Sequence, residues 1–170
     1  SGGCLQAAHE VMGILPSGEP LRSFSRLTSM AHLFDTDAIS ELLRPHPLQP
    51  YVDWLRGIPR DGQFASAVTI AELFKGAFRS AAKERHLVKL EERVLPAITL
   101  LPFDLSTARV FGMIRAELER TGNIFPDADL QIAATAIYHD LELVTGNIRH
   151  LRPIPNLRLN HILADSRTAH

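Results

Sequence analysis

The chain has 170 residues, about the size of one domain, and 45% of them are hydrophobic, which is enough for a sizeable core. Its formal net charge is -1, so the protein as a whole is not a polyanion-binding surface, and any contact with nucleic acid must come from a local basic patch. The absence of a long apolar run predicts no membrane span. The single cysteine, Cys4, excludes an internal disulfide; it fits a reducing compartment such as the expected cytoplasm, or makes no demand on the compartment.

Residues 1–29 differ from the rest of the chain. The sequence begins Ser1-Gly2-Gly3, without a methionine, and residues 16–20 combine proline with glycine and serine. Met30 directly precedes the first predicted strand, which makes it the expected natural start. We therefore expect a leader or cloning-derived extension over 1–29 that is poorly ordered or forms a short helix, one domain over 30–163, and a tail over 164–170.

The stretch 31–43 predicts a strand, a turn and a helix. An apolar run ends at Phe34, an acidic pair follows at Asp35 and Asp37, and apolar residues then recur at helical spacing. Thr36 or Asp37 can cap this helix, and for Asp37 that role is the simpler explanation. In an open α/β sheet, ligands bind beyond the carboxyl ends of the strands. Asp35 stands at such an end and is the first candidate site residue.

The rest of the chain alternates strands with helices. Two prolines end the first helix, Pro50 can start another, and Asp104 can cap a long helix. Further strands are predicted at 64–68, 97–103, 141–145 and 157–159, and helices at 69–78, 82–95, 105–120, from 126 onward and at 148–151. This alternation predicts a three-layer α/β/α fold with a mainly parallel sheet of four to five strands.

Four polar side chains are predicted to converge at one edge of that sheet. Asp35 and Asn147 each follow a strand, so both lie at carboxyl ends. Glu72 and Asp129 lie in the first turns of helices that begin at the same edge. Four oxygen-bearing side chains from four separate stretches would therefore line one crevice.

Each of these residues also has a simpler explanation. Glu72 could close a capping box with Thr69, and Asn147 could be a left-handed turn residue. Asp127 and Asp129 are two residues apart and do not share a helix face, so Asp127 suits the helix cap and Asp129 the pocket. The set as a whole is stronger support for a site than any one member.

Three carboxylates in one crevice repel one another, and a hard divalent cation is the simplest partner for them. Mg²⁺ or Mn²⁺ fits a set of oxygen ligands, whereas the sequence offers neither a Cys/His cluster for zinc, nor a glycine-rich phosphate loop, nor a Gly-x-Ser-x-Gly turn. Such a cation lowers the pKa of bound water and neutralises phosphate. The sequence therefore favours metal-dependent phosphodiester hydrolysis.

Four motifs resemble the PIN-domain ribonucleases, and within them the VapC-type and FitB-like toxins of bacterial type II toxin–antitoxin pairs. The motifs cover 34–42, 69–73, 127–136 and 143–151, and they occur in the order of the family. The resemblance implies an endoribonuclease dependent on Mg²⁺ or Mn²⁺. Its metal-holding carboxylates would be Asp35, Glu72 and Asp129, and Asn147 falls at the fourth catalytic position.

Two departures from the family pattern affect the site. Asp37 stands where asparagine is usual, which adds a charge, and Asn147 in place of aspartate weakens any second metal site. One tightly held ion is therefore expected. Basic residues near the same edge are the expected RNA contacts, with Arg44 more distant. These contacts are Lys75, Arg79, Arg149 and His150.

The resemblance also implies partners. A VapB-type antitoxin would wrap the domain and place a basic side chain in the acidic crevice, and residues 4–29 could dock where an antitoxin helix would. A symmetric homodimer is expected, for which Leu42, Leu43, Trp54 and Leu55 could supply the surface as easily as core.

Two other functions compete with this one. A haloacid-dehalogenase-like phosphatase would use Asp35 and Asp37, but that family needs a lysine and an acidic pair that the sequence lacks after Thr145. A non-catalytic PIN-like module would bind RNA or protein without cutting, and the intact acidic set argues against it. The sequence does not identify the RNA that would be cleaved.

Overall fold

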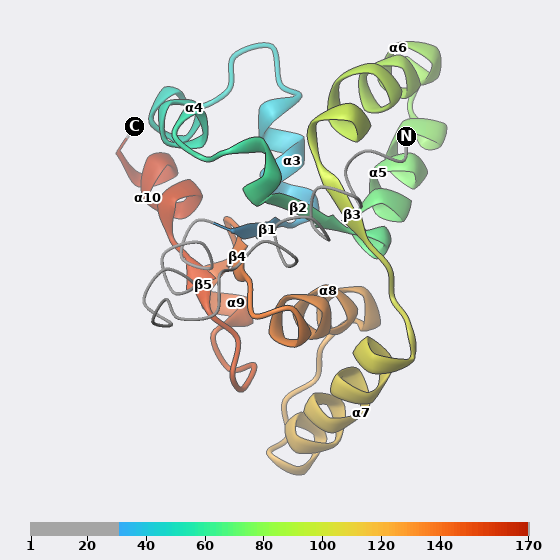
Figure 1. Cartoon of the computed structure of the whole chain (residues 1–170), viewed down its shortest axis with the longest axis vertical. Coiled ribbons are helices and arrows are strands. Elements are labelled where there is room, and N and C mark those ends of the chain that lie inside the picture. Colours follow the sequence, from blue (N-terminus) through green and yellow to red (C-terminus); the bar gives the residue numbers. More distant parts are fainter. Residues whose placement is uncertain (1–30, 170) are drawn as a thin grey trace, which may run out of the picture.

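The computed structural model of the chain describes residues 31–169, so the leader expected at 1–29 and the start expected at Met30 lie outside the described residues. The described part forms a five-stranded sheet between helical layers (Figure 1). None of its helices is both long and apolar enough to cross a bilayer.

All five strands are parallel, in the order β3-β2-β1-β4-β5. The strands are β1 (His32–Phe34), β2 (Gln63–Ser66), β3 (Thr99–Leu101), β4 (Glu142–Val144) and β5 (Leu159–Asn160). The chain moves outward from β1 to β3 and then returns to place β4 on the other side of β1. The strand order therefore reverses between β1 and β4, and the crevice beyond their carboxyl ends is where such sheets bind ligands. The predicted α/β fold with a parallel sheet is confirmed.

Helices cover both faces of the sheet (Figure 1). Helices α7 (Leu105–Arg120) and α8 (Asp127–Tyr138) pack together on one face. The other face carries α3 (Thr36–Leu42), α4 (Gln49–Arg56), α5 (Ala67–Arg79) and α6 (Lys83–Lys89), and α6 continues through a π turn at Leu90–Val94 and a 3-10 turn at Leu95–Ala97. A 3-10 turn at Arg60–Gly62 precedes β2, α9 (Ile148–Leu151) follows β4, and α10 (Ile162–Thr168) ends the described chain.

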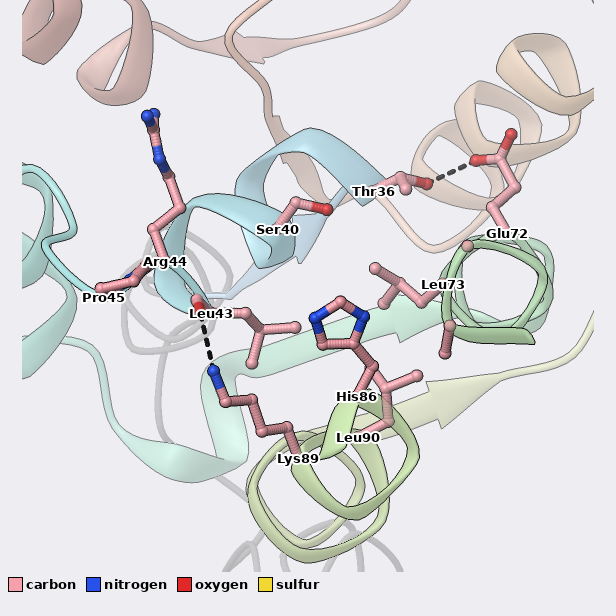
Figure 2. A pocket seen from close by; sticks show the side chains of 12 residues that line it. Thr36, Ser40, Leu43, Arg44, Pro45, Glu72, Leu73, His86, Lys89 and Leu90 are labelled. Atoms are coloured by element: carbon pink, nitrogen blue, oxygen red, sulfur yellow. Dashed lines mark hydrogen bonds between the residues drawn. The ribbon is translucent and has the colours of Figure 1, made fainter. Parts of the chain in front are cut away.

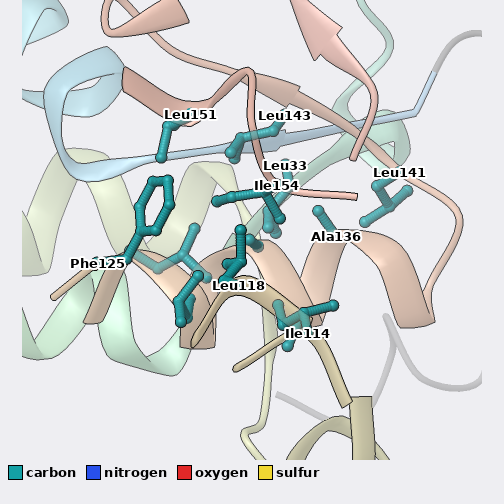
Figure 3. Packing of buried hydrophobic residues seen from close by; sticks show 13 residues of the cluster. Leu33, Ile114, Leu118, Phe125, Ala136, Leu141, Leu143, Leu151 and Ile154 are labelled. Atoms are coloured by element: carbon teal, nitrogen blue, oxygen red, sulfur yellow. The ribbon is translucent and has the colours of Figure 1, made fainter. Parts of the chain in front are cut away.

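The side-chain alternation of the two central strands divides the core in two. Leu33 and Leu143 face α7 and α8 and belong to a cluster with Ile114 and Leu118 (Figure 3). Phe34 and Val144, one residue further along, belong to the cluster on the other face. Burial of each such side chain contributes roughly 1.5–3 kcal/mol. Both central strands are thus buried on both faces, which holds their carboxyl ends rigidly in place.

The end of the chain differs from the expectation of a tail after Leu163. Residues Ile162–Thr168 form α10, which packs against α4. Leu163 is fully buried in the cluster that contains Phe34. This helix brings a basic side chain, Arg167, to the carboxyl edge of the sheet.

Candidate active site

A pocket of about 520 Å³ lies at the carboxyl ends of β1 and β4. The four residues predicted to converge, Asp35, Glu72, Asp129 and Asn147, all line it. Its other lining residues are Thr36, Asp37, Ser40, Ile132, Gly146, Leu151 and Arg167. The parallel register explains the convergence, because Phe34 and Val144 are paired and the residues that follow both strands leave the sheet side by side.

Asp35 has two structural roles in this pocket. Its backbone N–H donates to the Val144 carbonyl at 3.2 Å, which extends the strand pairing, and its side chain accepts from the Ala38 N–H at 2.8 Å. Asp35 is therefore the N-cap of α3, and the expectation that Thr36 or Asp37 caps this helix is wrong. A residue at the strand end can cap the helix because α3 begins without an intervening loop.

The pKa of Asp35 is raised to about 6, mainly by burial and to a smaller extent by the neighbouring carboxylates of Asp37 and Asp129. A hydrogen bond from Thr145 and the one from Ala38 act in the opposite direction. The net upward shift shows that the negative charge at this position is undercompensated. A cation at this position would therefore stabilise the charged form of Asp35.

Thr145 fixes the turn after β4. Its side chain is fully buried, its hydroxyl bonds to Asp35, and it accepts from the Asn147 N–H at 3.0 Å. Asn147 has a φ of -104° and precedes α9, so its interpretation as a left-handed turn residue is wrong. One hydroxyl therefore ties the candidate carboxylate to the turn that carries the candidate amide.

Glu72 reaches the pocket from α5. The Thr36 hydroxyl donates a short hydrogen bond to its carboxylate (Figure 2). The helix begins at Ala67, with Ser66 as the cap that accepts from the Val68 N–H at 3.0 Å. Glu72 accordingly lies in the second turn, and the capping box with Thr69, the simpler alternative for this residue, is not formed.

Asp129 lies in the first turn of α8 and pairs with His150, with 3.1 Å between the carboxylate Oδ2 and the ring Nε2. The imidazole also packs against Phe125, with ring centroids 4.9 Å apart. Asp127 forms an ion pair with Arg115, while Pro126 occupies the cap position without a side-chain bond. The assignment of Asp127 to the cap is therefore wrong, whereas Asp129 does face the pocket.

The structure adds one site residue that the sequence did not indicate. Arg167 of α10 donates two hydrogen bonds of 2.8 Å to the two oxygens of Asp37. The pair joins positions 130 residues apart, and Arg167 lies in the segment that was expected to be a tail. The usable signal was Asp37 itself, because an extra carboxylate beside an acidic crevice needs a cationic partner.

None of the four predicted RNA contacts is among the residues that line this pocket. Lys75, Arg79 and Arg149 are exposed, and His150 is held by Asp129. They stay predictions. A second pocket of about 480 Å³ adjoins the first and shares three of its lining residues, Thr36, Ser40 and Glu72.

This second pocket adds basic residues that the sequence did not single out (Figure 2). His86 and Lys89 line it from α6, and the Lys89 ammonium donates to the Leu43 carbonyl at 3.4 Å. Arg44 also lines it, but its guanidinium points away from His86 and Glu72 in Figure 2.

The donor set suits a hard cation. Within residues 31–169, no three His, Cys, Asp or Glu side chains stand close enough together to hold a metal as they are oriented. Thr145, Thr36 and His150 each engage one of the three candidate carboxylates. Mg²⁺ takes only one or two carboxylates directly and keeps several waters, so a compact cluster of three is not required. The residues present therefore fit Mg²⁺ or Mn²⁺ by the chemistry of their oxygens.

Residues 33–153 match the PIN domain family, a segment that includes all four candidate residues. The chain belongs to the PIN-domain family. It is similar to the toxin FitB of Neisseria gonorrhoeae, with 37% identity over 118 residues that cover 66% of this chain and 85% of FitB. It is also similar to the ribonuclease VapC2 of Rickettsia felis, with 32% identity over 133 residues that cover 78% of this chain and 98% of VapC2.

A solved structure agrees with these relatives. The structure of VapBC2 from Rickettsia felis, bound to a DNA fragment from its promoter, superposes on this PIN domain with a TM-score of 0.71 and 30% identity. The match covers 76% of this chain and 97% of that one. The resemblance to VapC-type and FitB-like toxins is thereby confirmed, and the haloacid-dehalogenase-like phosphatase is set aside.

Proposed function

We propose that this PIN domain is a metal-dependent endoribonuclease toxin of a toxin–antitoxin module that hydrolyses phosphodiester bonds in RNA. The observation that carries the proposal is the convergence of Asp35, Glu72 and Asp129 on one pocket, and the raised pKa of Asp35 supports it. A bound Mg²⁺ or Mn²⁺ relieves such repulsion, lowers the pKa of a coordinated water and neutralises the substrate phosphate. The proposed ligands of this cation are Asp35, Asp129 and Glu72, and Asn147 completes the proposed catalytic set.

The protein's own groups orient these carboxylates. Thr145 and the Ala38 N–H fix Asp35, and Thr36 fixes Glu72. His150 holds Asp129. Groups that orient metal ligands are worth about 10–100-fold in affinity or activity when removed. The two threonines and His150 are therefore positioning residues of the proposed site.

The substrate is RNA, and its phosphates are bound by basic side chains around the pocket. Arg149 is the strongest candidate because α9 starts directly after Asn147, and Lys75, Arg79 and His150 are further contacts. Loss of one phosphate contact should weaken binding and reduce its salt dependence. An Arg149→Ala variant with unchanged affinity and salt slope would remove Arg149 from the list.

The partner is a VapB-type antitoxin, as in the VapBC2 complex of Rickettsia felis. This PIN domain would act in the cytoplasm, where its RNA substrate is located. A homodimer is also proposed, but Leu42, Leu43, Trp54 and Leu55 pack against the core cluster of their own chain. Phe78 on α5, with 60% of its surface exposed, is a freer apolar side chain for such contact.

A cleavage assay tests the function. Total RNA is incubated with wild-type protein and with Asp35→Asn, each with Mn²⁺ or with EDTA, and the new 5′ ends are sequenced. Cleavage by the wild-type protein with Mn²⁺ alone, and none by Asp35→Asn, is the expected result. Arg158→Gln is the control, because Arg158 forms an exposed ion pair with Asp140 at the other end of the sheet. Binding of RNA without cleavage would favour the non-catalytic module, and activity in EDTA would refute the metal.

A further inference from the structure

The charge balance of the pocket rests on one residue of α10. Four carboxylates line the pocket, those of Asp35, Asp37, Glu72 and Asp129. Among the described residues that line it, Arg167 is the one with a permanent positive charge. Where that charge is directed therefore decides how many carboxylates are left for a cation.

The guanidinium of Arg167 is directed to Asp37. Both terminal nitrogens donate to it, each at 2.8 Å and to a different oxygen, which is the bidentate geometry of a strong pair. The Arg167 Nη2 also lies 3.7 Å from the carboxylate of Glu41, one helical turn after Asp37 on α3. Glu41 is itself buried and accepts from the Leu48 N–H at 3.1 Å. The arginine is thus held against α3.

The Asp37–Arg167 pair lies directly against the backbone at Gly146. A Cβ at Gly146 would overlap the Arg167 guanidinium and the Asp37 carboxylate. Gly146 separates Thr145, which bonds to Asp35, from Asn147, which lines the pocket. The Asp37–Arg167 pair therefore lies directly on the turn that supports the candidate catalytic groups, and α10 forms a wall of the pocket.

We propose that Arg167 is a positioning residue that removes Asp37 from the carboxylates available to the cation and fixes α10 as a wall of the active site. This inference rests on the proposed function. It explains how the site accommodates aspartate at position 37, where the resemblance to the family implies asparagine. The charge added by Asp37 is cancelled within the same chain, so the cation meets the other three carboxylates.

This role predicts shifts of opposite sign for the two partners. Arg167→Gln leaves an uncompensated carboxylate beside the cation and should tighten Mn²⁺ binding by at least about fivefold. Asp37→Asn leaves an uncompensated guanidinium and should weaken binding by a similar factor. The double variant removes both charges and should return to about the wild-type affinity. A purely structural contact would not produce this pattern.

The experiment is a calorimetric titration of Mn²⁺ alone into the metal-free full chain. It is carried out on a double-mutant cycle of four proteins: the wild type, Arg167→Gln, Asp37→Asn and the double variant. Arg158→Gln is the matched control, since it removes an arginine from an ion pair with Asp140 at 2.9 Å far from the site. Its Mn²⁺ affinity should equal that of the wild type. Circular dichroism checks folding, and if Arg167→Gln does not fold, the weakening by the nearly isosteric Asp37→Asn tests the proposal by itself.

RNA cleavage at saturating Mn²⁺ supplies the second measurement. Arg167→Gln should cleave about tenfold more slowly or worse, because the freed Asp37 competes for the cation and repels the RNA phosphate. Faster cleavage by Arg167→Gln at unchanged Mn²⁺ affinity would overturn the proposal, because it would mean that Arg167 inhibits the site. Equal Mn²⁺ affinities across the cycle would overturn this inference alone, whereas a wild-type protein that binds no Mn²⁺ would overturn the proposed function together with it.

Discussion

Replacing Asp35 with asparagine should stabilise the cation-free protein although it destroys the proposed site. Asparagine keeps the shape of the side chain and an oxygen that can accept from the Ala38 N–H, so the cap of α3 is retained. The substitution removes a charge that the fold penalises. The difference between the ordinary pKa of 3.8 and the folded value of about 6 corresponds to at most about 3 kcal/mol at neutral pH.

The gain should depend on pH in a defined direction. The folded-state pKa of Asp35 lies above its unfolded value, so the charged form disfavours folding. This penalty is fully present above pH 6 and disappears as the pH falls through 6 toward 3.8. The advantage of Asp35→Asn should therefore be about 1 to 3 kcal/mol at pH 7.5 and about half of that at pH 5.

Urea unfolding followed by circular dichroism measures this difference, with EDTA present in every sample. Asp35→Ala is the informative control because it removes the same charge but also the cap acceptor, which costs about 1 kcal/mol. It should be less stable than Asp35→Asn by that amount at both pH values. An Asp35→Asn protein that is less stable than the wild type at pH 7.5, or a difference that does not change with pH, would refute the reasoning.

Three further predictions concern the same pocket. Thr145→Val removes the hydroxyl that bonds to the Asn147 N–H and to Asp35. It should lower the free energy of unfolding by about 1–3 kcal/mol, measured by urea unfolding, and the initial rate of cleavage by about 10–100-fold. Asp129→Ala should abolish cleavage, whereas Asp127→Ala should leave it unchanged and cost less than about 1 kcal/mol, since it breaks only an exposed ion pair. Mn²⁺ affinity, measured by calorimetry, should fall as the pH drops below 6, because protonation of Asp35 then competes with the cation; a flat profile from pH 7.5 to 5 would contradict its role as a ligand.

The parts of this fold that follow from local chemistry could be predicted from the sequence. Asp104 was expected to cap the helix over 105–120, and it does so by accepting from the Thr107 N–H at 3.1 Å. Strand and helix order predicted the parallel sheet. The convergence of Asp35 with Asn147 followed from that order, because residues after neighbouring parallel strands leave the sheet together.

The caps at the site could not be predicted because several acceptors competed for each helix end. Asp35, Thr36 and Asp37 are all capable caps, and the strand end decides which one occupies the position. At α5, Ser66 took the cap ahead of Thr69 because the helix starts directly after the strand. A shift of a few residues in a helix start lies beyond what local propensity can specify.

Contacts between residues far apart in the sequence could not be predicted from the sequence either. Arg167 reaches Asp37 only because α10 packs on α4 and places its own last turn beside α3. Periodicity within 162–168 is too short to show on which element that helix packs. The pairing of His150 with Asp129 depends in the same way on the position of α9 relative to α8.

Stability and function are linked in this pocket through one charge. The burial that raises the pKa of Asp35 disfavours the cation-free fold, and a cation that binds only the folded protein removes that penalty. A penalty of at most about 3 kcal/mol corresponds to as much as roughly a hundredfold in cation affinity. The side chains that hold Asp35, from Thr145 to the cap of α3, keep the carboxylate in place while its charge is uncompensated. Under the proposed function, the bound cation would thus offset the electrostatic penalty that the fold places on Asp35.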